Sequence, residues 1–172
     1  MIRIINAGDL RLMRRVNQWQ APKWIRRSVI VASRAGDGWL WGLVGLVILL
    51  FGGADRFIAL TAAAESLAVG FVTFLVLKRV IGRARPCTLE DHCWAGLLPP
   101  DRFSFPSGHT ISAFAVAVPL SWYYPSLLIG LVFCALSVGA SRILLGLHYL
   151  SDVIAGIAIG VAIGVLMVQF PL

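Results

Sequence analysis

The hydrophobic residues of this chain lie in long runs that short polar segments separate. Runs of this kind cross a bilayer as helices, because lipid offers no water to the backbone and every N–H and C=O group must bond internally. The first run would measure only about 22 Å as a helix, less than the ~30 Å hydrocarbon core, so its helix should begin earlier, within 24–35, or lie in a thinned bilayer. The pattern predicts an all-α polytopic transmembrane helical bundle with five clear spans, at 39–53, 57–80, 109–124, 126–145 and 149–170.

The N-terminal segment, residues 1–38, mixes charged and bulky apolar residues instead. Leu12, Val16 and Trp19 recur at helical spacing with arginines between them, a pattern that favours a helix lying in the headgroup layer. A solvated basic arm and a sixth span are the alternatives. The segment lacks the compact apolar core of a signal peptide, so we expect no cleavage. We therefore divide the chain into this basic amphipathic segment and a transmembrane domain, 39–172.

Composition supports a membrane protein and excludes a soluble one. Hydrophobic residues make up 59% of the chain and charged residues 13%, with a mean hydropathy of +0.85, whereas a soluble domain has about 45–50% and about 25%. The net charge is +7, but the cations lie outside the apolar runs rather than on a soluble basic face. The charge therefore indicates anionic lipid or phosphate partners in a phospholipid bilayer, and no nucleic acid.

One long polar segment, 81–105, separates the second and third runs, and a loop of this length in so small a protein is usually functional. With five spans, this loop, the N-terminus and the junction 142–148 share one membrane face. That face carries every Lys and Arg except Arg56, so the positive-inside rule assigns it to the cytoplasm. A disulfide between Cys87 and Cys93 in the loop would instead need an oxidising compartment, and a sixth span would invert the assignment.

Three clusters on this face carry candidate chemistry, and the first is the sequence from Lys78 to Pro86. Lys78 and Arg85 are seven residues apart, about two helical turns, so both could point to one side if the helix persisted. Pro86 disfavours a helical conformation at Arg85. A lysine and a forked guanidinium at a helix end are suited to phosphate oxygens. Taken alone, the cluster equally fits a positive flank that anchors a membrane helix.

The second cluster, Pro106-Ser107-Gly108-His109, opens the third run. Ser107 is suited to the helix N-cap, and Gly108 would let a ligand approach the backbone. His109 lies in the first turn, where free amides attract anions. The alternative is a capped helix with a surface histidine.

The third cluster runs from Ser141 to Asp152 and contains Arg142 and His148. His148 and Asp152 are four residues apart, hence on one helical face and able to form a hydrogen bond. An aspartate on one ring nitrogen leaves the other nucleophilic and stabilises the imidazolium. The alternative is a salt bridge at the start of a helix, although an ionic pair at the mouth of an apolar span is costly unless it is used.

Together and in this order, the three clusters resemble the type 2 phosphatidic acid phosphatase superfamily of membrane lipid phosphatases. Its signatures, Lys-x6-Arg-Pro, Pro-Ser-Gly-His and Ser-Arg-x5-His-x3-Asp, are all matched without a substitution. The resemblance covers roughly 57–170. Members of the family usually have six transmembrane helices, one more than the five clear runs found here.

The resemblance implies a role for each matched residue. His148 would attack phosphorus and form a phosphohistidine, Asp152 would orient it, and His109 would protonate the leaving oxygen and later activate water. No metal or other cofactor would be needed, because cationic side chains would bind the phosphoryl group. The residues that would hold this group are Lys78, Arg85, Ser107, Gly108 and Arg142, around an active-site loop over 81–107.

The function expected is hydrolysis of a lipid phosphate or diphosphate, with polyprenyl diphosphate, phosphatidylglycerol phosphate and phosphatidic acid as candidate substrates. The spacing does not define the headgroup or the oligomeric state. Vanadate-dependent haloperoxidases share the site, but membrane embedding argues against that activity. A non-catalytic lipid transporter or scaffold is the other alternative, and the intact His109, His148 and Asp152 argue against it. The small size and the lack of a targeting sequence suggest a bacterial inner (cytoplasmic) membrane.

A few residues outside the clusters have candidate roles of their own. Glu65 is the only carboxylate well inside a run, where it is either functional or a neutral packed acid. His92 between the two loop cysteines lacks the further ligands that zinc requires, so no metal is expected. Cys134 fits the core. A stripe of small residues at 156, 160 and 164 permits close helix contact, which we expect within the monomer.

Overall fold

The computed structural model describes residues 7–89 and 102–170 of the chain. Over these residues the chain is helical, and its β pairing is a single bridge between Ala84 and Phe103. The all-α prediction is confirmed. In chain order the elements are α1 (Ala7–Gln18), α2 (Lys23–Ala35), α3 (Trp39–Phe51), the 3₁₀ helix η1 (Gly53–Asp55), α4 (Arg56–Ile81), α5 (Pro86–Leu89), α6 (Gly108–Tyr123), the 3₁₀ helix η2 (Pro125–Leu127), α7 (Leu128–Leu144) and α8 (Leu150–Gln169).

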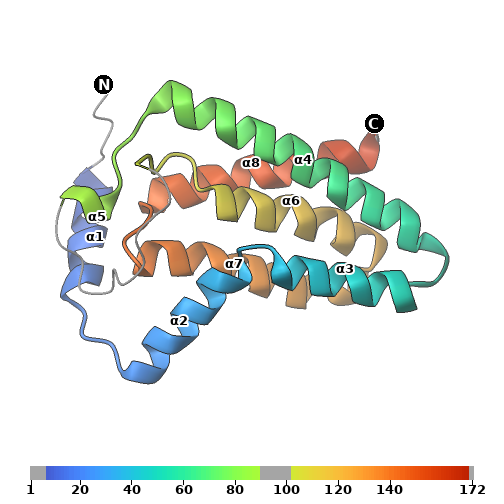
Figure 1. The fold of residues 1–172 in the computed structure, drawn as a ribbon, viewed down its shortest axis with the longest axis horizontal. Coiled ribbons are helices and arrows are strands. Elements are labelled where there is room, and N and C mark those ends of the chain that lie inside the picture. Colours follow the sequence, from blue (N-terminus) through green and yellow to red (C-terminus); the bar gives the residue numbers. More distant parts are fainter. Residues whose placement is uncertain (1–6, 90–101, 171–172) are drawn as a thin grey trace.

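The helices α3, α4, α6, α7 and α8 run along the long axis of the molecule, and α1, α2 and α5 lie at one end of it (Figure 1). The turns η1 and η2 lie at the opposite end. The central helix is α6, which packs against α4, α7 and α8. The glycine stripe of α8 faces α6, since a Cβ on Gly160 would lie 2.6 Å from the carbonyl oxygen of Ile111. Glycine is therefore required for the two backbones to approach this closely.

Three segments of the described chain are long and apolar enough to cross a membrane, namely Gly53–Ile81, Pro125–Leu144 and Leu150–Gln169. The helices α2 and α3 qualify only as a pair, bent by 62° at the break between them, which gives up to four spans. The five spans expected from the sequence are not confirmed, because α3 has 13 residues and α6 has 16, lengths of about 20 and 24 Å. Helix α6 packs against α4, α7 and α8, and nine of its 16 residues are buried.

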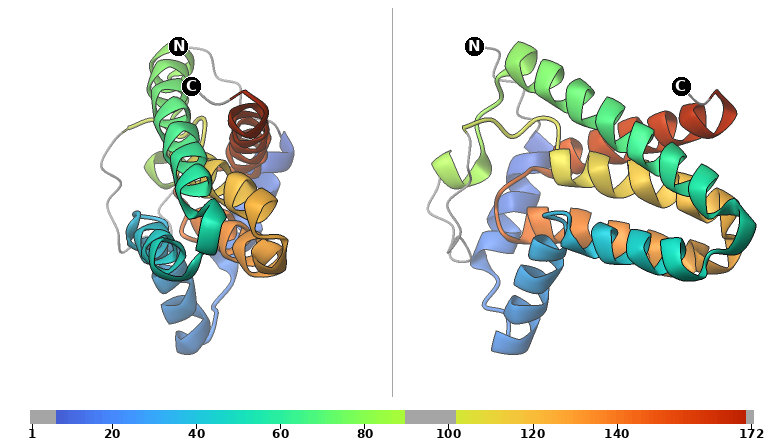
Figure 2. Two further views of the ribbon diagram at one scale, coloured as in Figure 1. Left: turned by 90° about the vertical axis from the view of Figure 1, so that its right-hand side faces the viewer. Right: turned by 45° about the vertical axis from the view of Figure 1, so that its right-hand side comes forward.

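The N-terminal segment folds as two short helices that pack on the bundle. Figure 2 shows α1 lying against the end of the bundle where α7 ends and α8 begins, and α1 contacts both helices. Asp9 and Met13 are its buried residues, while Arg11, Arg14 and Arg15 remain exposed. At 12 residues α1 is too short to span a bilayer. It is therefore a docked surface helix, and the alternative of a solvated arm is wrong for this part of the chain.

Candidate functional site

The three sequence clusters meet at the end of the bundle that carries α1, α2 and α5. They surround a cavity of about 340 Å³. Six of the eight predicted site residues line it, and the other two, Ser107 and Asp152, are completely buried. The lining residues are Gly36, Asp37, Phe71, Phe74, Lys78, Arg85, Gly108, His109, Ser112, Arg142 and His148.

In the first cluster, the helix ends before Arg85. Helix α4 ends at Ile81, and Gly82 follows in the left-handed region with φ 57°. Lys78 therefore lies in the last helical turn, with its Nζ 4.4 Å from the centre of the Phe74 ring. Arg85 is buried, and its Nη1 donates to the carbonyl oxygen of Leu147 at 2.8 Å. Lys78 therefore reaches the cavity from α4 and Arg85 reaches it from the segment after α4, so the two cations do not share one helical face.

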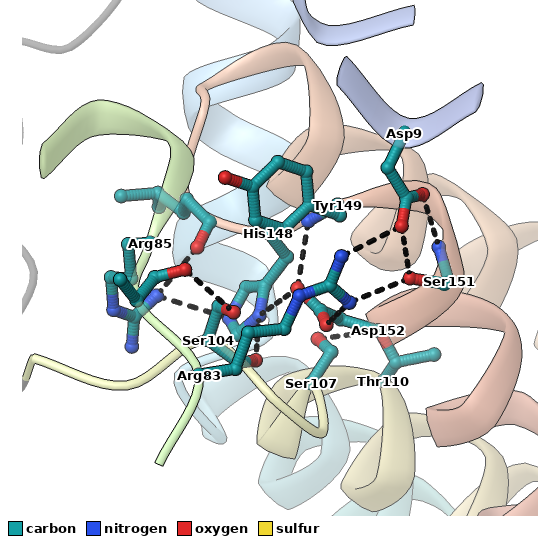
Figure 3. Close-up of polar contacts among 12 residues, drawn as sticks. Asp9, Arg83, Arg85, Ser104, Ser107, Thr110, His148, Tyr149, Ser151 and Asp152 are labelled. Atoms are coloured by element: carbon teal, nitrogen blue, oxygen red, sulfur yellow. Dashed lines mark hydrogen bonds and ion pairs between the residues drawn. The ribbon is translucent and has the colours of Figure 1, made fainter. Parts of the chain in front are cut away.

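His148 lies in the turn between α7 and α8 and is held by a backbone carbonyl (Figure 3). Its Nδ1 is 2.6 Å from the carbonyl oxygen of Ser104, and its Nε2 is 3.2 Å from Nη1 of Arg85. A carbonyl only accepts hydrogen bonds and a guanidinium only donates them. Nδ1 therefore carries the proton, and Nε2 keeps its lone pair. Sequence analysis did not identify Ser104, because a backbone acceptor leaves no side-chain signature.

The structure corrects the expected contact between Asp152 and His148. The Oδ2 atom of Asp152 lies 3.8 Å from Nδ1 of His148, beyond hydrogen-bond distance. Its carboxylate instead accepts from the N–H of Tyr149 at 2.8 Å and from Nη1 of Arg83 at 2.7 Å. Asp152 is in the first turn of α8, where unpaired backbone N–H groups attract a carboxylate. It fixes the start of the helix that follows His148 rather than the imidazole itself.

Burial sets the charge of His148. The residue is only 3% exposed, and this loss of water is the main cause that lowers the pKa of its imidazole to about 4. The positive charges of Arg85 and Arg142 lower the pKa further, whereas Asp152 raises it and offsets only part of the shift. An ordinary histidine has a pKa near 6.5. His148 is therefore neutral at pH 7, with a lone pair on Nε2.

Two contacts connect the cavity to the last turn of α2 and to the break that follows it. Arg142 donates from Nη1 to Oγ of Ser33 at 2.6 Å, and Nε2 of His109 lies 2.8 Å from Oδ1 of Asp37. Neither Ser33 nor Asp37 was among the predicted site residues. The only signal available was the pair of glycines around Asp37, which marks the break between the helices.

Ser107 does not present its side chain to the cavity. Its N–H donates to the carbonyl oxygen of Asp152 at 3.1 Å, and its Oγ accepts from Oγ1 of Thr110 at 2.8 Å. Ser107 is the N-cap residue of α6 as expected, but its side chain makes no cap hydrogen bond. Gly108 lines the wall as expected, and a Cβ there would lie 2.9 Å from the Phe74 ring.

The other candidates lie apart from the cavity lining. The described part of the chain contains no group of three or more His, Cys, Asp and Glu residues placed to hold a metal ion. Cys87 is half-buried, and its N–H donates to the carbonyl oxygen of Gly146 at 3.1 Å. The proposed disulfide partner Cys93 and the neighbouring His92 lie outside the described residues. Glu65 is a half-buried residue of α4 that does not line the cavity.

Comparison with known proteins gives consistent matches. The lipid A 1-phosphatase of Rhizobium johnstonii is 29% identical over 161 residues, which cover 82% of this chain and 66% of that protein. The decaprenylphosphoryl-5-phosphoribose phosphatase of Mycobacterium tuberculosis is 34% identical over 140 residues, 76% of this chain and 70% of that protein. The chain thus spans slightly less than two thirds of the Rhizobium protein.

The fold comparison extends over nearly the whole chain. The crystal structure of LpxE from Aquifex aeolicus has a TM-score of 0.84 and 26% sequence identity, covering 99% of this chain and 100% of that one. Residues 59–172 match the family model described as the PAP2 superfamily. The resemblance predicted from the three motifs is confirmed, and the chain belongs to the PAP2 superfamily.

Proposed function

We propose that this protein is a membrane lipid-phosphate phosphatase that works through a phosphohistidine on His148. The observation that carries the proposal is a single cavity lined by three cationic side chains and two histidines, those of Lys78, Arg85, Arg142, His109 and His148. The cations match the negative charge of a phosphate, and the lone pair of Nε2, which faces Nη1 of Arg85, supplies a nucleophile.

In the first step, Nε2 of His148 attacks phosphorus. The new P–N bond forms as the bond from phosphorus to the lipid oxygen breaks, and His109 transfers a proton to that oxygen. Lys78, Arg85 and Arg142 stabilise the charge on the phosphoryl oxygens in the transition state. The Nδ1–H donated to Ser104 stabilises the positive charge that develops on the imidazole.

In the second step, water attacks the phosphohistidine. His109 takes a proton from this water, the P–N bond breaks, and inorganic phosphate leaves with His148 again neutral. The cationic side chains supply the positive charge for both transition states. We therefore propose a reaction that needs no metal.

A second cavity supports a lipid substrate. An apolar groove of about 680 Å³ lies between α3, α4 and α6. Gly36, Asp37, Phe71 and Ser112 line both this groove and the candidate active site, so the two spaces adjoin. A hydrocarbon chain in the groove would place its phosphate among the cations. Together with the candidate membrane-spanning helices, this supports a multi-pass membrane protein. Its location in the bacterial inner membrane stays a proposal from the sequence.

For the substrate, the comparisons favour lipid A 1-phosphate. This lipid was not among the candidates from sequence, but a relative with that activity aligns over 82% of the chain. The polyprenyl phosphates and diphosphates stay candidates, because the mycobacterial relative is named for a decaprenylphosphoryl compound. Phosphatidylglycerol phosphate and phosphatidic acid complete the set.

The test is phosphate release by the purified protein in detergent from each of these lipids. We expect release from at least one lipid, and none from a His148→Ala variant. Binding of the same lipids by wild-type protein without release would refute the phosphatase and favour the transporter or scaffold.

A further inference from the structure

A buried carboxylate of the N-terminal helix lies beside the candidate active site. Asp9 of α1 is 7% exposed. Its Oδ1 accepts from the N–H of Ser151 at 3.1 Å, and its Oδ2 accepts from Oγ of Ser151 at 2.6 Å and from Nη2 of Arg83 at 2.7 Å (Figure 3). The contacts with Ser151 join two parts of the chain 142 residues apart. The family motifs do not include Asp9.

Arg83, the cationic partner of Asp9, connects to the nucleophile along two routes. Its Nη1 donates to Asp152 at 2.7 Å, and Asp152 accepts the N–H of Tyr149, the residue after His148. Its carbonyl oxygen accepts from the N–H of Ser104 at 2.7 Å, and the carbonyl of Ser104 accepts Nδ1 of His148. A shift of the Arg83 side chain would therefore reach His148 through the start of α8, and a shift of its backbone would reach the ring through Ser104.

The buried guanidinium of Arg83 pairs with two carboxylates, those of Asp9 and Asp152. The side chain is 5% exposed and stacks 4.2 Å from the centre of the Tyr149 ring. A buried charge without its partner is strongly unfavourable, so the guanidinium must be compensated where it lies. Burial raises the pKa of Asp9, but the hydrogen bonds from Ser151 and Arg83 outweigh this and leave the pKa below its ordinary value. Asp9 is thus an anion at neutral pH.

We propose that Asp9 is a positioning residue for the phosphatase site. It holds the guanidinium of Arg83 and the first turn of α8 in the places where Ser104 and Tyr149 fix His148 with Nε2 toward the cavity. The inference rests on the proposed function for its catalytic consequence. It also assigns the docked helix α1 a role in the active site beyond contact with the membrane surface.

The direct test compares Asp9→Asn with Asp55→Asn, an exposed carboxylate in η1 at the opposite end of the bundle. Both variants are assayed in detergent with the lipid that wild type hydrolyses and with p-nitrophenyl phosphate, which lacks a lipid chain. We expect kcat of Asp9→Asn to fall about 10- to 100-fold on both substrates, with KM nearly unchanged, because small displacements of a nucleophile have effects of this size. Asp55→Asn should match wild type.

Two results in this comparison would overturn the inference. If folded Asp9→Asn keeps the wild-type kcat and loses only thermal stability, the residue has a structural role alone. If the lipid rate falls but the p-nitrophenyl phosphate rate does not, α1 serves lipid capture rather than the position of His148. A double-mutant cycle with Arg83→Lys adds a third criterion, because action through Arg83 requires the two losses to be non-additive.

A second measurement separates this inference from the proposed function. Diethyl pyrocarbonate modifies accessible neutral histidines, and His148 is 3% exposed in the intact protein. We expect the modification rate of His148, read by mass spectrometry, to rise several-fold in Asp9→Asn and not in Asp55→Asn. A rise in a protein that releases phosphate from no lipid would support the positioning role while refuting the phosphatase. An unchanged rate together with an unchanged kcat would refute the positioning role alone.

Discussion

The change Asp152→Asn tests how the carboxylate of Asp152 supports His148. Both of its partners are hydrogen-bond donors, the N–H of Tyr149 at 2.8 Å and Nη1 of Arg83 at 2.7 Å. An asparagine amide offers one acceptor oxygen and one donor NH₂, so one donor loses its acceptor whichever way the amide turns. The substitution also removes one of the two carboxylates that compensate the buried charge of Arg83.

The structure sets the size of the expected effect. Asp152 is completely buried and Arg83 is 5% exposed, so water cannot replace the lost interaction. Breaking a buried ion pair costs about 3–5 kcal/mol. For a chain of this size, each kcal/mol corresponds to about 2–4 °C in the melting temperature, which gives a loss of roughly 6–20 °C. The displaced start of α8 should in addition lower kcat by about 10²-fold, because a small displacement of a catalytic group has effects of this size.

The assay pairs thermal unfolding in detergent with phosphate release, and Asp55→Asn is the matched control. We expect both stability and kcat to fall in Asp152→Asn and neither to fall in the control. A large loss of kcat at unchanged melting temperature would contradict this reasoning, because it would indicate direct orientation of His148 by Asp152 without the buried pair. Wild-type behaviour in both assays would contradict any role for the residue.

Three further predictions follow from the site and the groove. EDTA should leave the rate of phosphate release unchanged while vanadate inhibits it, and a loss of activity restored by added metal would contradict the cationic site. The imidazole of His148 should stay neutral down to about pH 4–5 in ¹⁵N NMR spectra, because burial lowers its pKa to about 4, and a titration near pH 6.5 would refute the buried state. The folded state should also lose stability as the pH falls from about 6.5 toward 4, since His148 of the unfolded chain binds its proton at the higher pH. Gly42→Leu should raise KM for the lipid at least about 10-fold and leave p-nitrophenyl phosphate hydrolysis unchanged, because a Cβ at Gly42 meets open space in the groove and a leucine would occupy the path of the lipid chain. The control is Gly130→Leu, since Gly130 also faces open space but lies on α7. Equal effects of the two variants would exclude the groove as the lipid site.

The sequence predicted the candidate site best at positions where the side chain itself would bind or react with the phosphate. The spacing of Lys78, Arg85, His109, Arg142 and His148 predicted residues that the structure places around one cavity. The helical class also followed directly from the apolar runs, because lipid requires internal backbone hydrogen bonding. The number of spans did not follow, since an apolar run does not define the length of the helix that it forms: α3 has 13 residues and α6 has 16.

The missing features depend on contacts between distant parts of the chain. Ser104 supports His148 through a backbone carbonyl, which any residue could supply. Asp9 is one acidic residue in a basic helix, and only the fold places it beside Arg83. Asp152 has the spacing for a direct bond to His148, yet the first turn of α8 and Arg83 compete for the same carboxylate. The spacing of two residues in the sequence shows which side chains share one helical face, but it does not show donors from other segments that compete for the same carboxylate.

The central claim is that Nε2 of His148 becomes covalently bound to phosphorus during turnover. The most direct measurement is to quench the wild-type protein during hydrolysis of a ³²P-labelled lipid phosphate and to locate the label by mass spectrometry. The account predicts an acid-labile, base-stable phosphoryl group on His148 that is lost in His148→Ala and accumulates in His109→Ala when a lipid with a good leaving group is used. Turnover without any label on His148, or label on another residue, would contradict it.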